Sequence, residues 1–164
     1  MKIAVTGGAG FIGSHITDAY LALGHEVVII DNLSTGRREN INPKAKFVEI
    51  DINSPEIHTL FATEKFDIIC HHAAQMDVRF SVSNPQVDAM NNIIGSINLF
   101  EACKNSGVKK IIFASSGGAV YGEQSYFPAD EQHLQNPCSP YGITKLSCEK
   151  YLYYYKEVCG IDYV

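Results

Sequence analysis

The stretch Thr6-Gly7-Gly8-Ala9-Gly10-Phe11-Ile12-Gly13 decides how this chain of 164 residues folds. Apolar residues before it predict a strand over Lys2 to Thr6, and the amphipathic pattern after it predicts a helix over Phe11 to Leu23. Its glycines follow a G-x-x-G-x-x-G spacing, at Gly7, Gly10 and Gly13. Between a strand and a helix, such glycines permit a tight turn, a close approach of the backbone to a pyrophosphate, and close packing of the helix. The free N–H groups and positive dipole end of the helix would face the phosphates, so the loop predicts a dinucleotide-binding site.

The alternation of short β-branched runs and longer amphipathic stretches continues along the chain. Strands are predicted at Lys2 to Thr6, Glu26 to Asp31, Lys46 to Ile50, Asp67 to His71 and Lys109 to Ser115, and helices at Phe11 to Leu23, Pro55 to Glu64, Pro85 to Ser106 and Pro140 to Cys159. This order predicts an α/β fold, a doubly wound parallel sheet of the Rossmann type, in one domain over residues 1–164. The polar stretch Gly122 to Pro140 is the longest irregular segment, and loops of that length are usually functional. Ile161 to Val164 resemble the opening of a further buried strand, so we expect a chain truncated before a C-terminal substrate domain.

Composition and charge narrow the class of protein. With 46% hydrophobic and 19% charged residues, the chain has the composition of a soluble globular domain. A net charge of -5 provides no basic field for a phosphate backbone, so nucleic acid is not an expected partner. No apolar run approaches the roughly 20 residues that span a bilayer, and no signal peptide precedes the glycine loop, so we expect a cytoplasmic protein without membrane contact. The five cysteines are widely spaced, which predicts free thiols and no metal site.

An acidic residue closes the second predicted strand. Asp31 lies about 20 residues beyond the glycine loop, where a carboxylate accepts hydrogen bonds from an adenosine ribose and repels a 2′-phosphate. This position favours NAD over NADP as the cofactor. Arg37 and Arg38 argue the other way, because arginine accommodates a 2′-phosphate. They stand several residues further along the loop, so we give Asp31 more weight.

Tyr141 and Lys145 stand four residues apart at the start of the last predicted helix, just after Pro140. Residues at this spacing share one helical face, and a nearby ammonium group lowers the pKa of a phenol, so Tyr141 could act as a general base toward a hydroxyl group. The same spacing is also common on solvated helix faces.

Ser115 and Ser116 follow the fifth predicted strand, at the carboxyl end where open α/β sheets bind ligands. A serine hydroxyl there could hold the reacting oxygen, and the alternative is a simple Ser/Gly turn.

Further polar residues leave the fourth predicted strand or lie in the helix after it. His71 and His72 are consecutive, and consecutive strand residues point to opposite faces, so the pair does not predict a metal site. The small Ala73 and Ala74 that follow would let a ribose lie close to the backbone. Asn92 is polar where the surrounding periodicity is apolar. It is either a buried amide that bridges helix and strand or a surface residue.

With these motifs in this order, the chain resembles the NAD-dependent epimerase/dehydratase family of the extended short-chain dehydrogenase type. The resemblance runs from Lys2 to Val164 and rests on six segments: Thr6 to His15, Asp31 to Gly36, Asp51-Ile52, His72 to Gln75, Ser115 to Gly122, and Ser139 to Lys145. It implies NAD as the cofactor and a UDP-hexose nucleotide sugar as the substrate. The implied activity is epimerisation at carbon 4, as in the interconversion of UDP-glucose and UDP-galactose, through transient oxidation to a 4-keto sugar.

The resemblance also implies roles for residues at matching positions. The implied cofactor contacts are Gly7, Gly10, Phe11, Ile12 and Gly13 at the pyrophosphate, Asp31, Asn32, Ser34, Thr35 and Gly36 around the adenosine ribose, Asp51 and Ile52 beside the adenine, and Ala73, Ala74, Gln75, Asn92 and Ser115 along the remaining cofactor. Tyr141 would be the catalytic base, and Lys145 would bind the nicotinamide ribose. The family's catalytic serine falls on Ser116 or Gly117, because Gly117-Gly118 adds a residue, and we assign it to Ser116.

Other functions are compatible with the same motifs. A 4,6-dehydratase would need an acid/base pair, typically Asp-Glu, where Gly118-Ala119 stand. A UDP-glucuronate epimerase or decarboxylase also remains possible, because the residues that select the group at sugar carbon 6 would lie mainly outside this chain. The chain could also bind NAD without turnover, or keep the fold as an interaction protein.

The resemblance implies a homodimer as well. Family members often dimerise through two helices, which here would come from Pro85 to Ser106 and Pro140 to Cys159. The apolar side chains of the second helix, Tyr151, Leu152, Tyr154 and Tyr155, would suit such an interface or a core equally well.

Overall fold

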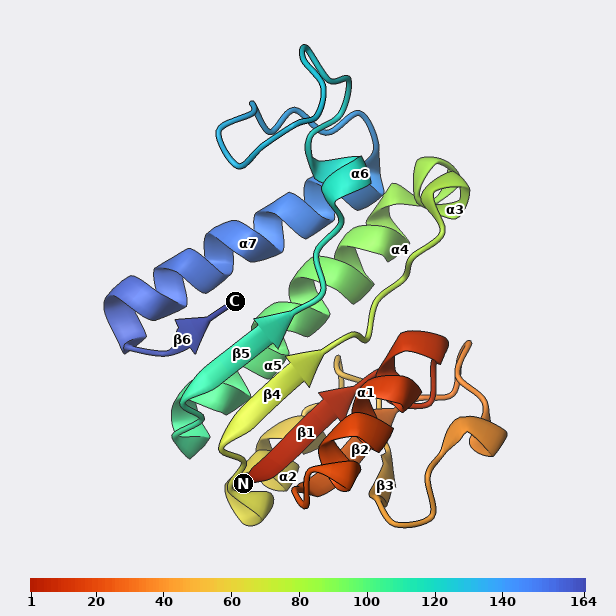
Figure 1. The fold of residues 1–164 in the computed structure, drawn as a ribbon, viewed down its shortest axis with the longest axis vertical. Coiled ribbons are helices and arrows are strands. Elements are labelled where there is room, and N and C mark those ends of the chain that lie inside the picture. The colour runs from red at the N-terminus through yellow and green to blue at the C-terminus, as the bar shows by residue number, and fades with distance from the viewer.

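The computed structural model describes residues 1–164 and contains one six-stranded sheet, in which every pair of neighbouring strands is parallel (Figure 1). The strands are β1 (Lys2–Thr6), β2 (Glu26–Asp31), β3 (Lys46–Glu49), β4 (Ile68–His71), β5 (Lys110–Phe113) and β6 (Asp162–Tyr163). Their order across the sheet is β3-β2-β1-β4-β5-β6. This is the strand order of a Rossmann fold, so the predicted fold class is confirmed. It reverses direction between β1 and β4, and ligands of such sheets bind beyond the carboxyl ends at that point.

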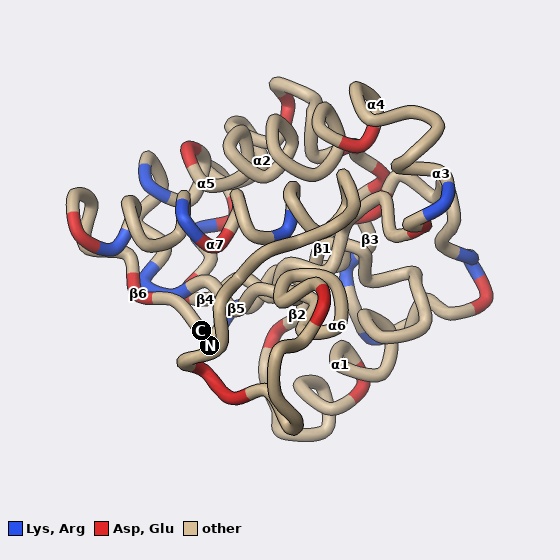
Figure 2. The backbone as a smooth tube through the Cα atoms, turned by 90° about the horizontal axis from the view of Figure 1, so that it is seen from above, with Lys and Arg blue, Asp and Glu red and all other residues tan.

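Helices cover both faces of the sheet. They are α1 (Phe11–Ala22), α2 (Glu56–Glu64), α3 (Val78–Ser83), α4 (Pro85–Ala89), the π-helix η2 (Met90–Ile94), α5 (Gly95–Ser106), α6 (Gly117–Val120) and α7 (Pro140–Cys159), with one 3-10 turn, η1 (Arg38–Asn40). Figure 2, seen from above, shows α1 on one side of the strands and α2 and α5 on the other. The larger core lies on the second side, where Ile57, Phe100 and Leu152 from α2, α5 and α7 are buried against the sheet. No helix is long and apolar enough to cross a membrane.

The helix predicted over Pro85 to Ser106 has the predicted bounds, but it is not α-helical throughout. Its middle turn is the π-helix η2, which separates α4 from α5. Two short helices, α3 and α6, were not predicted. Helix α3 begins where the Asp77 side chain accepts hydrogen bonds from the N–H groups of Arg79 and Phe80. Elements of four to six residues are too short to show a helical period, which is why the pattern missed them.

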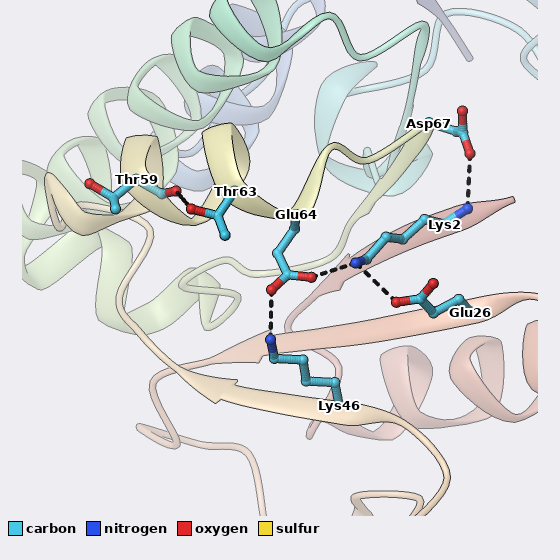
Figure 3. Close-up of polar contacts among 7 residues, drawn as sticks. All are labelled: Lys2, Glu26, Lys46, Thr59, Thr63, Glu64 and Asp67. Carbon is cyan, nitrogen blue, oxygen red and sulfur yellow. Dashed lines mark hydrogen bonds and ion pairs between the residues drawn. The ribbon is translucent and has the colours of Figure 1, made fainter.

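A cluster of charged side chains joins the amino ends of the strands, at the edge opposite the glycine loop (Figure 3). The Lys2 ammonium lies 2.5 Å from Glu64 and 2.9 Å from Glu26, and the Lys46 ammonium lies 2.6 Å from Glu64. Because Lys2, Glu26 and Lys46 begin β1, β2 and β3, and Glu64 ends α2, the cluster ties three strands to one helix. Ion pairs hold this edge together, whereas the opposite edge carries the loops of the candidate site.

Candidate functional site

The glycine loop connects β1 to α1 at the carboxyl edge of the sheet. Gly7 has a φ of +69°, and a Cβ atom there would lie 2.7 Å from the backbone nitrogen of Ala73, so only glycine fits this turn. A Cβ atom at Gly13 would meet the Gly7 carbonyl oxygen at 2.3 Å. Gly13 therefore lets α1 pack closely on the loop that follows β1.

The first turn of α1 presents unpaired donors. The N–H groups of Phe11, Ile12 and Gly13 have no acceptor in the protein, and the N-cap residue Gly10 offers no side-chain cap. The first turn also carries no acidic residue. Phe11 and Ile12 are 79% and 61% exposed, so ligand atoms can reach this turn. The arrangement suits an anionic group such as a pyrophosphate.

Asp31 lies directly against the glycine loop. Its carboxylate accepts hydrogen bonds from the N–H groups of Ala9 at 3.0 Å and Leu33 at 2.8 Å, and the residue is 7% exposed. A carboxylate has about four acceptor positions, so two remain for a ligand. A Cβ atom at Gly36 would come within 2.8 Å of the same carboxylate, which shows how closely the loop after β2 covers it.

The remaining residues predicted around an adenosine lie on the loops that follow β2 and β3. The Asn32 amide donates to Asp51 at 2.7 Å and accepts from the Ser34 N–H at 3.0 Å. Ser34 and Thr35 are exposed on the loop, and Ile52 is buried, with its side chain against Gly95. Arg37 and Arg38 are exposed and pair with Glu39 and Glu49, respectively. Both guanidinium groups are therefore engaged by carboxylates other than Asp31.

The loop after β4 is held against the glycine loop by a buried series of hydrogen bonds. The Thr6 hydroxyl lies 2.7 Å from His71 Nδ1 and accepts from the Ala73 N–H at 3.2 Å. His71 Nε2 lies 2.9 Å from the Ser96 hydroxyl. Burial, reinforced by the charge of Lys145, lowers the pKa of His71 to about 3, so the ring is neutral. Thr6 and Ser96 were not predicted to contact His71, because only the fold brings the three residues together.

Lys145 is 4% exposed on the inner side of α7. Its ammonium donates to the Ala114 carbonyl oxygen at 2.9 Å and lies 4.8 Å from the centre of the Phe113 ring. It lies 5.8 Å from the centre of the Tyr141 ring, so the two side chains do share one face, as predicted. Burial lowers the pKa of Lys145 to about 8.

Tyr141 is half-buried at the start of α7. Its backbone N–H donates to the Ser81 hydroxyl at 3.2 Å, while the Ser139 side chain caps the helix. Burial raises the pKa of the Tyr141 phenol, and this outweighs the opposite effect of the nearby Ser116 hydroxyl. The expectation that Lys145 lowers this pKa is therefore wrong for the protein alone, because the ammonium is engaged with Ala114.

Helix α6 places Ser116 beside Tyr141. A Cβ atom at Gly142 would lie 2.5 Å from the Ala119 carbonyl oxygen, so glycine at this position lets the first turns of α6 and α7 touch. The structure thus brings together Ser116, Tyr141 and Lys145. Gly117 has open space around its Cα and no side chain to offer. The Ser115 hydroxyl instead donates to Glu149 and lines a separate hollow with Gln135 and Tyr153, so a cofactor contact of Ser115 would have to come from its backbone.

Asn92 bridges the helix layer and the loop after β4. It is 2% exposed, its amide oxygen accepts from the Gln75 N–H at 2.8 Å, and its amide nitrogen donates to the Gln75 carbonyl oxygen at 2.9 Å. Of the two possibilities left open by its polar position, the buried bridging amide is the one observed.

Comparison with known proteins gives a consistent result. The model of the family described as "NAD dependent epimerase/dehydratase family" matches residues 3–164. A protein of Methanocaldococcus jannaschii, provisionally named UDP-glucose 4-epimerase, is 48% identical over 161 residues, which are 98% of this chain and 53% of that protein. The Thermotoga maritima UDP-glucose 4-epimerase solved with UDP-glucose is 45% identical with a TM-score of 0.97, and the Thermus thermophilus UDP-glucose 4-epimerase solved with NAD is 42% identical with a TM-score of 0.96. Each alignment covers 99% of this chain and 53% of the solved one. The chain thus spans about half the length of these relatives.

Proposed function

Because this chain belongs to the NAD dependent epimerase/dehydratase family, we propose that it provides the NAD site and the acid–base centre of an enzyme that epimerises a UDP-hexose at carbon 4. The observation that carries this proposal is the meeting of Ser116, Tyr141 and Lys145 at the carboxyl edge of the sheet, the edge that also carries the glycine loop. The relatives named above add the substrate class, because their names specify UDP-glucose 4-epimerase.

The chain's own residues fit NAD. The free N–H groups of Phe11, Ile12 and Gly13 suit the pyrophosphate, and the two unused acceptor positions of Asp31 suit the adenosine ribose diol. A 2′-phosphate at the same place would meet the Asp31 carboxylate, which disfavours NADP. The buried Lys145 ammonium lies where it could donate to the nicotinamide ribose.

Tyr141 performs the proton transfers in this proposal. Its phenolate takes the proton of the sugar's 4-hydroxyl group, and the phenol returns the proton when the hydroxyl is re-formed. Ser116 hydrogen-bonds both the phenol and the reacting oxygen, and Lys145 stabilises the phenolate once its ammonium turns from Ala114 toward the ribose. NAD, when bound, supplies the acceptor that takes the hydride from carbon 4 and returns it to the opposite face of the rotated 4-keto sugar.

Dehydration at carbons 4 and 6 is the nearest alternative within the family. It needs a further acid/base pair beside the tyrosine. Helix α6, which follows Ser116, consists of Gly117, Gly118, Ala119 and Val120, and none of them carries an ionisable group. The site therefore supports proton transfer at a single hydroxyl group, which favours epimerisation.

The surface of two adjacent helices supports assembly as a homodimer. Val87, Met90 and Ile94 on α4 and η2 are 46%, 53% and 50% exposed, and their spacing places them on one side. Ile143, Tyr151 and Tyr154 form a similar row on α7, which packs against both elements. Apolar side chains arranged in such a patch favour association with a second copy.

The five free cysteines favour a reducing compartment, in agreement with a cytoplasmic protein.

The test of the cofactor assignment is a calorimetric titration of this chain with NAD and with NADP, after removal of any bound nucleotide. We expect NAD to bind and NADP to bind at least about tenfold more weakly, because its phosphate meets the Asp31 carboxylate. Asp31→Asn should weaken NAD binding and reduce the difference in affinity between NAD and NADP. Asp18→Asn, which removes an exposed carboxylate from α1, is the charge-matched control and should change neither value. Failure of the folded, nucleotide-free chain to bind NAD would overturn the proposal, and equal affinities would overturn the role of Asp31.

A further inference from the structure

Asp88 is a carboxylate that is fully buried beneath the site, with 0% exposure. One carboxylate oxygen accepts from the Gln75 amide at 2.8 Å and the Asn92 amide at 3.1 Å, and the other accepts from the Thr144 hydroxyl at 3.0 Å. It forms no ion pair with any lysine, arginine or histidine. Burying a charge without a cation is unfavourable, so the carboxylate depends on these three neutral donors.

The three donors belong to separate segments that meet only here. Gln75 lies in the loop after β4, Asn92 in the π-helix η2, and Thr144 in the first turn of α7. Thr144 Oγ1 also lies 2.9 Å from the carbonyl oxygen of Tyr141, and Thr144 precedes Lys145 in the chain. Asp88 therefore links the loop that faces the glycine loop to the turn that carries the tyrosine and the lysine.

The π-helix completes this link. In its wider turn, the Asn92 carbonyl oxygen accepts from the Ser96 hydroxyl and from the Cys148 thiol of α7 at 3.1 Å. The Asn92 side chain bonds with Gln75 and Asp88 at the same time, so this one residue contacts the Gln75 loop, Asp88 and α7.

We propose that Asp88 is a positioning residue of the Tyr141–Lys145 centre: it fixes the first turn of α7 to the Gln75 loop and places a negative charge near both side chains. The inference deepens the proposed function and rests on it for the roles of Tyr141 and Lys145.

The charge of Asp88 acts on both side chains. It favours the ammonium form of the buried Lys145 and raises the pKa of Tyr141, in each case as a smaller effect than burial. The other titratable groups near Lys145 are His71 and His72 on β4 and its following loop, and Cys148 on α7. Burial lowers the pKa of both histidines and raises that of the thiol, so all three are neutral near pH 7. Asp88 is thus the charged group that acts on both Lys145 and Tyr141.

Asp88→Asn separates the charge from the hydrogen bonds. The asparagine carbonyl oxygen can accept from Gln75 and Asn92, and its amide can donate to Thr144 Oγ1, which then donates to the Tyr141 carbonyl oxygen. The measurement is the titration of Tyr141 in the ligand-free chain, followed by NMR of ring-labelled tyrosine, with Tyr141→Phe to assign the signal. We expect the pKa of Tyr141 to fall by about half a pH unit in Asp88→Asn. Asp18→Asn, the same substitution on the surface, should leave the pKa of Tyr141 unchanged. An unchanged titration in folded Asp88→Asn would overturn the role of the charge.

Thr144→Val tests the link without touching the carboxylate. Valine keeps the shape of threonine but cannot donate to Asp88, so we expect faster amide hydrogen exchange over residues 141–145 and at least about threefold weaker NAD binding, with Thr144→Ser restoring both. Unchanged exchange would overturn the positioning role, and this variant decides the case if Asp88→Asn does not fold. Because the Tyr141 titration and the hydrogen exchange are measured without nucleotide, a chain that fails to bind NAD would contradict the proposed function and leave both tests of Asp88 valid.

Discussion

At the scale of single residues, Tyr141 shows how its surroundings determine its chemistry. Burial raises its pKa, Ser116 opposes that effect, and Lys145 is engaged with the Ala114 carbonyl oxygen. The protein alone therefore holds Tyr141 as a phenol. A ligand that draws the Lys145 ammonium toward the phenol would favour the phenolate, so we expect Tyr141 to become a base only when the cofactor is in place.

Tyr141→Phe tests this role in a protein of the full length of the relatives. Phenylalanine keeps the ring and removes the only group that can take the 4-hydroxyl proton. We expect turnover of UDP-glucose to fall by at least about a hundredfold, while NAD affinity stays within a factor of about two. A coupled assay for UDP-galactose and a calorimetric titration measure the two quantities. Undiminished turnover would show that another group is the base.

At the scale of secondary structure elements, α7 has two apolar sides with different partners. Leu152 and Tyr155 are buried against the sheet and α5, whereas Tyr151 and Tyr154 are 40% and 46% exposed on the outer side. The sequence left all four as candidates for either an interface or a core. The structure assigns the first pair to the core and leaves the second pair for the proposed dimer.

Tyr151→Glu tests the proposed dimer surface. A carboxylate at the centre of an apolar interface would be buried without a partner, so we expect the dimer to dissociate at least about tenfold more readily. Sedimentation equilibrium over a range of protein concentrations measures this change. Tyr153→Glu is the matched control, because Tyr153 is also exposed on α7 but lines the hollow near β6. A wild-type chain that remains monomeric, or equal effects of the two substitutions, would contradict the proposed surface.

At the scale of the whole molecule, the two edges of the sheet have different roles. The carboxyl edge carries unpaired N–H groups and buried charges without ion pairs, while the amino edge carries the cluster of Lys2, Glu26, Lys46 and Glu64 (Figure 3). Hydrogen bonds from Lys2 and Lys46 lower the pKa of Glu64 below its usual value of 4.5. A lowered pKa means that this carboxylate stabilises the fold above about pH 4.5 and loses that contribution as the pH falls through its folded-state pKa.

Glu64→Gln should therefore destabilise the chain in a pH-dependent way. We expect the free energy of unfolding to fall by about 1 kcal/mol at pH 7, and the difference from wild type to shrink below pH 4. Urea unfolding at the two pH values measures it. Glu26→Gln is the control, because the Glu26 side chain is 64% exposed and contacts Lys2 alone, so its effect should be smaller. A difference that persists undiminished at low pH would rule out the charge as its source.

Features that depend on neighbouring residues were predictable from the sequence alone. The bounds of β1, β2 and α7 agree with the prediction, because alternation, helical spacing and the Ser139 and Pro140 start signals act over a few residues. The glycine loop was also recognisable, since its turn, its free N–H groups and Asp31 follow a fixed local spacing.

Contacts between distant residues became visible only in the three-dimensional fold. Strand order, the link from Thr6 through His71 to Ser96, and the meeting of Gln75, Asp88 and Thr144 join residues 13 to 65 positions apart. The π-helix and the raised pKa of Tyr141 follow from those contacts and leave no periodic trace in the chain. Burial and hydrogen bonding of polar groups depend on what packs around them, and a sequence pattern reports only which face a residue occupies.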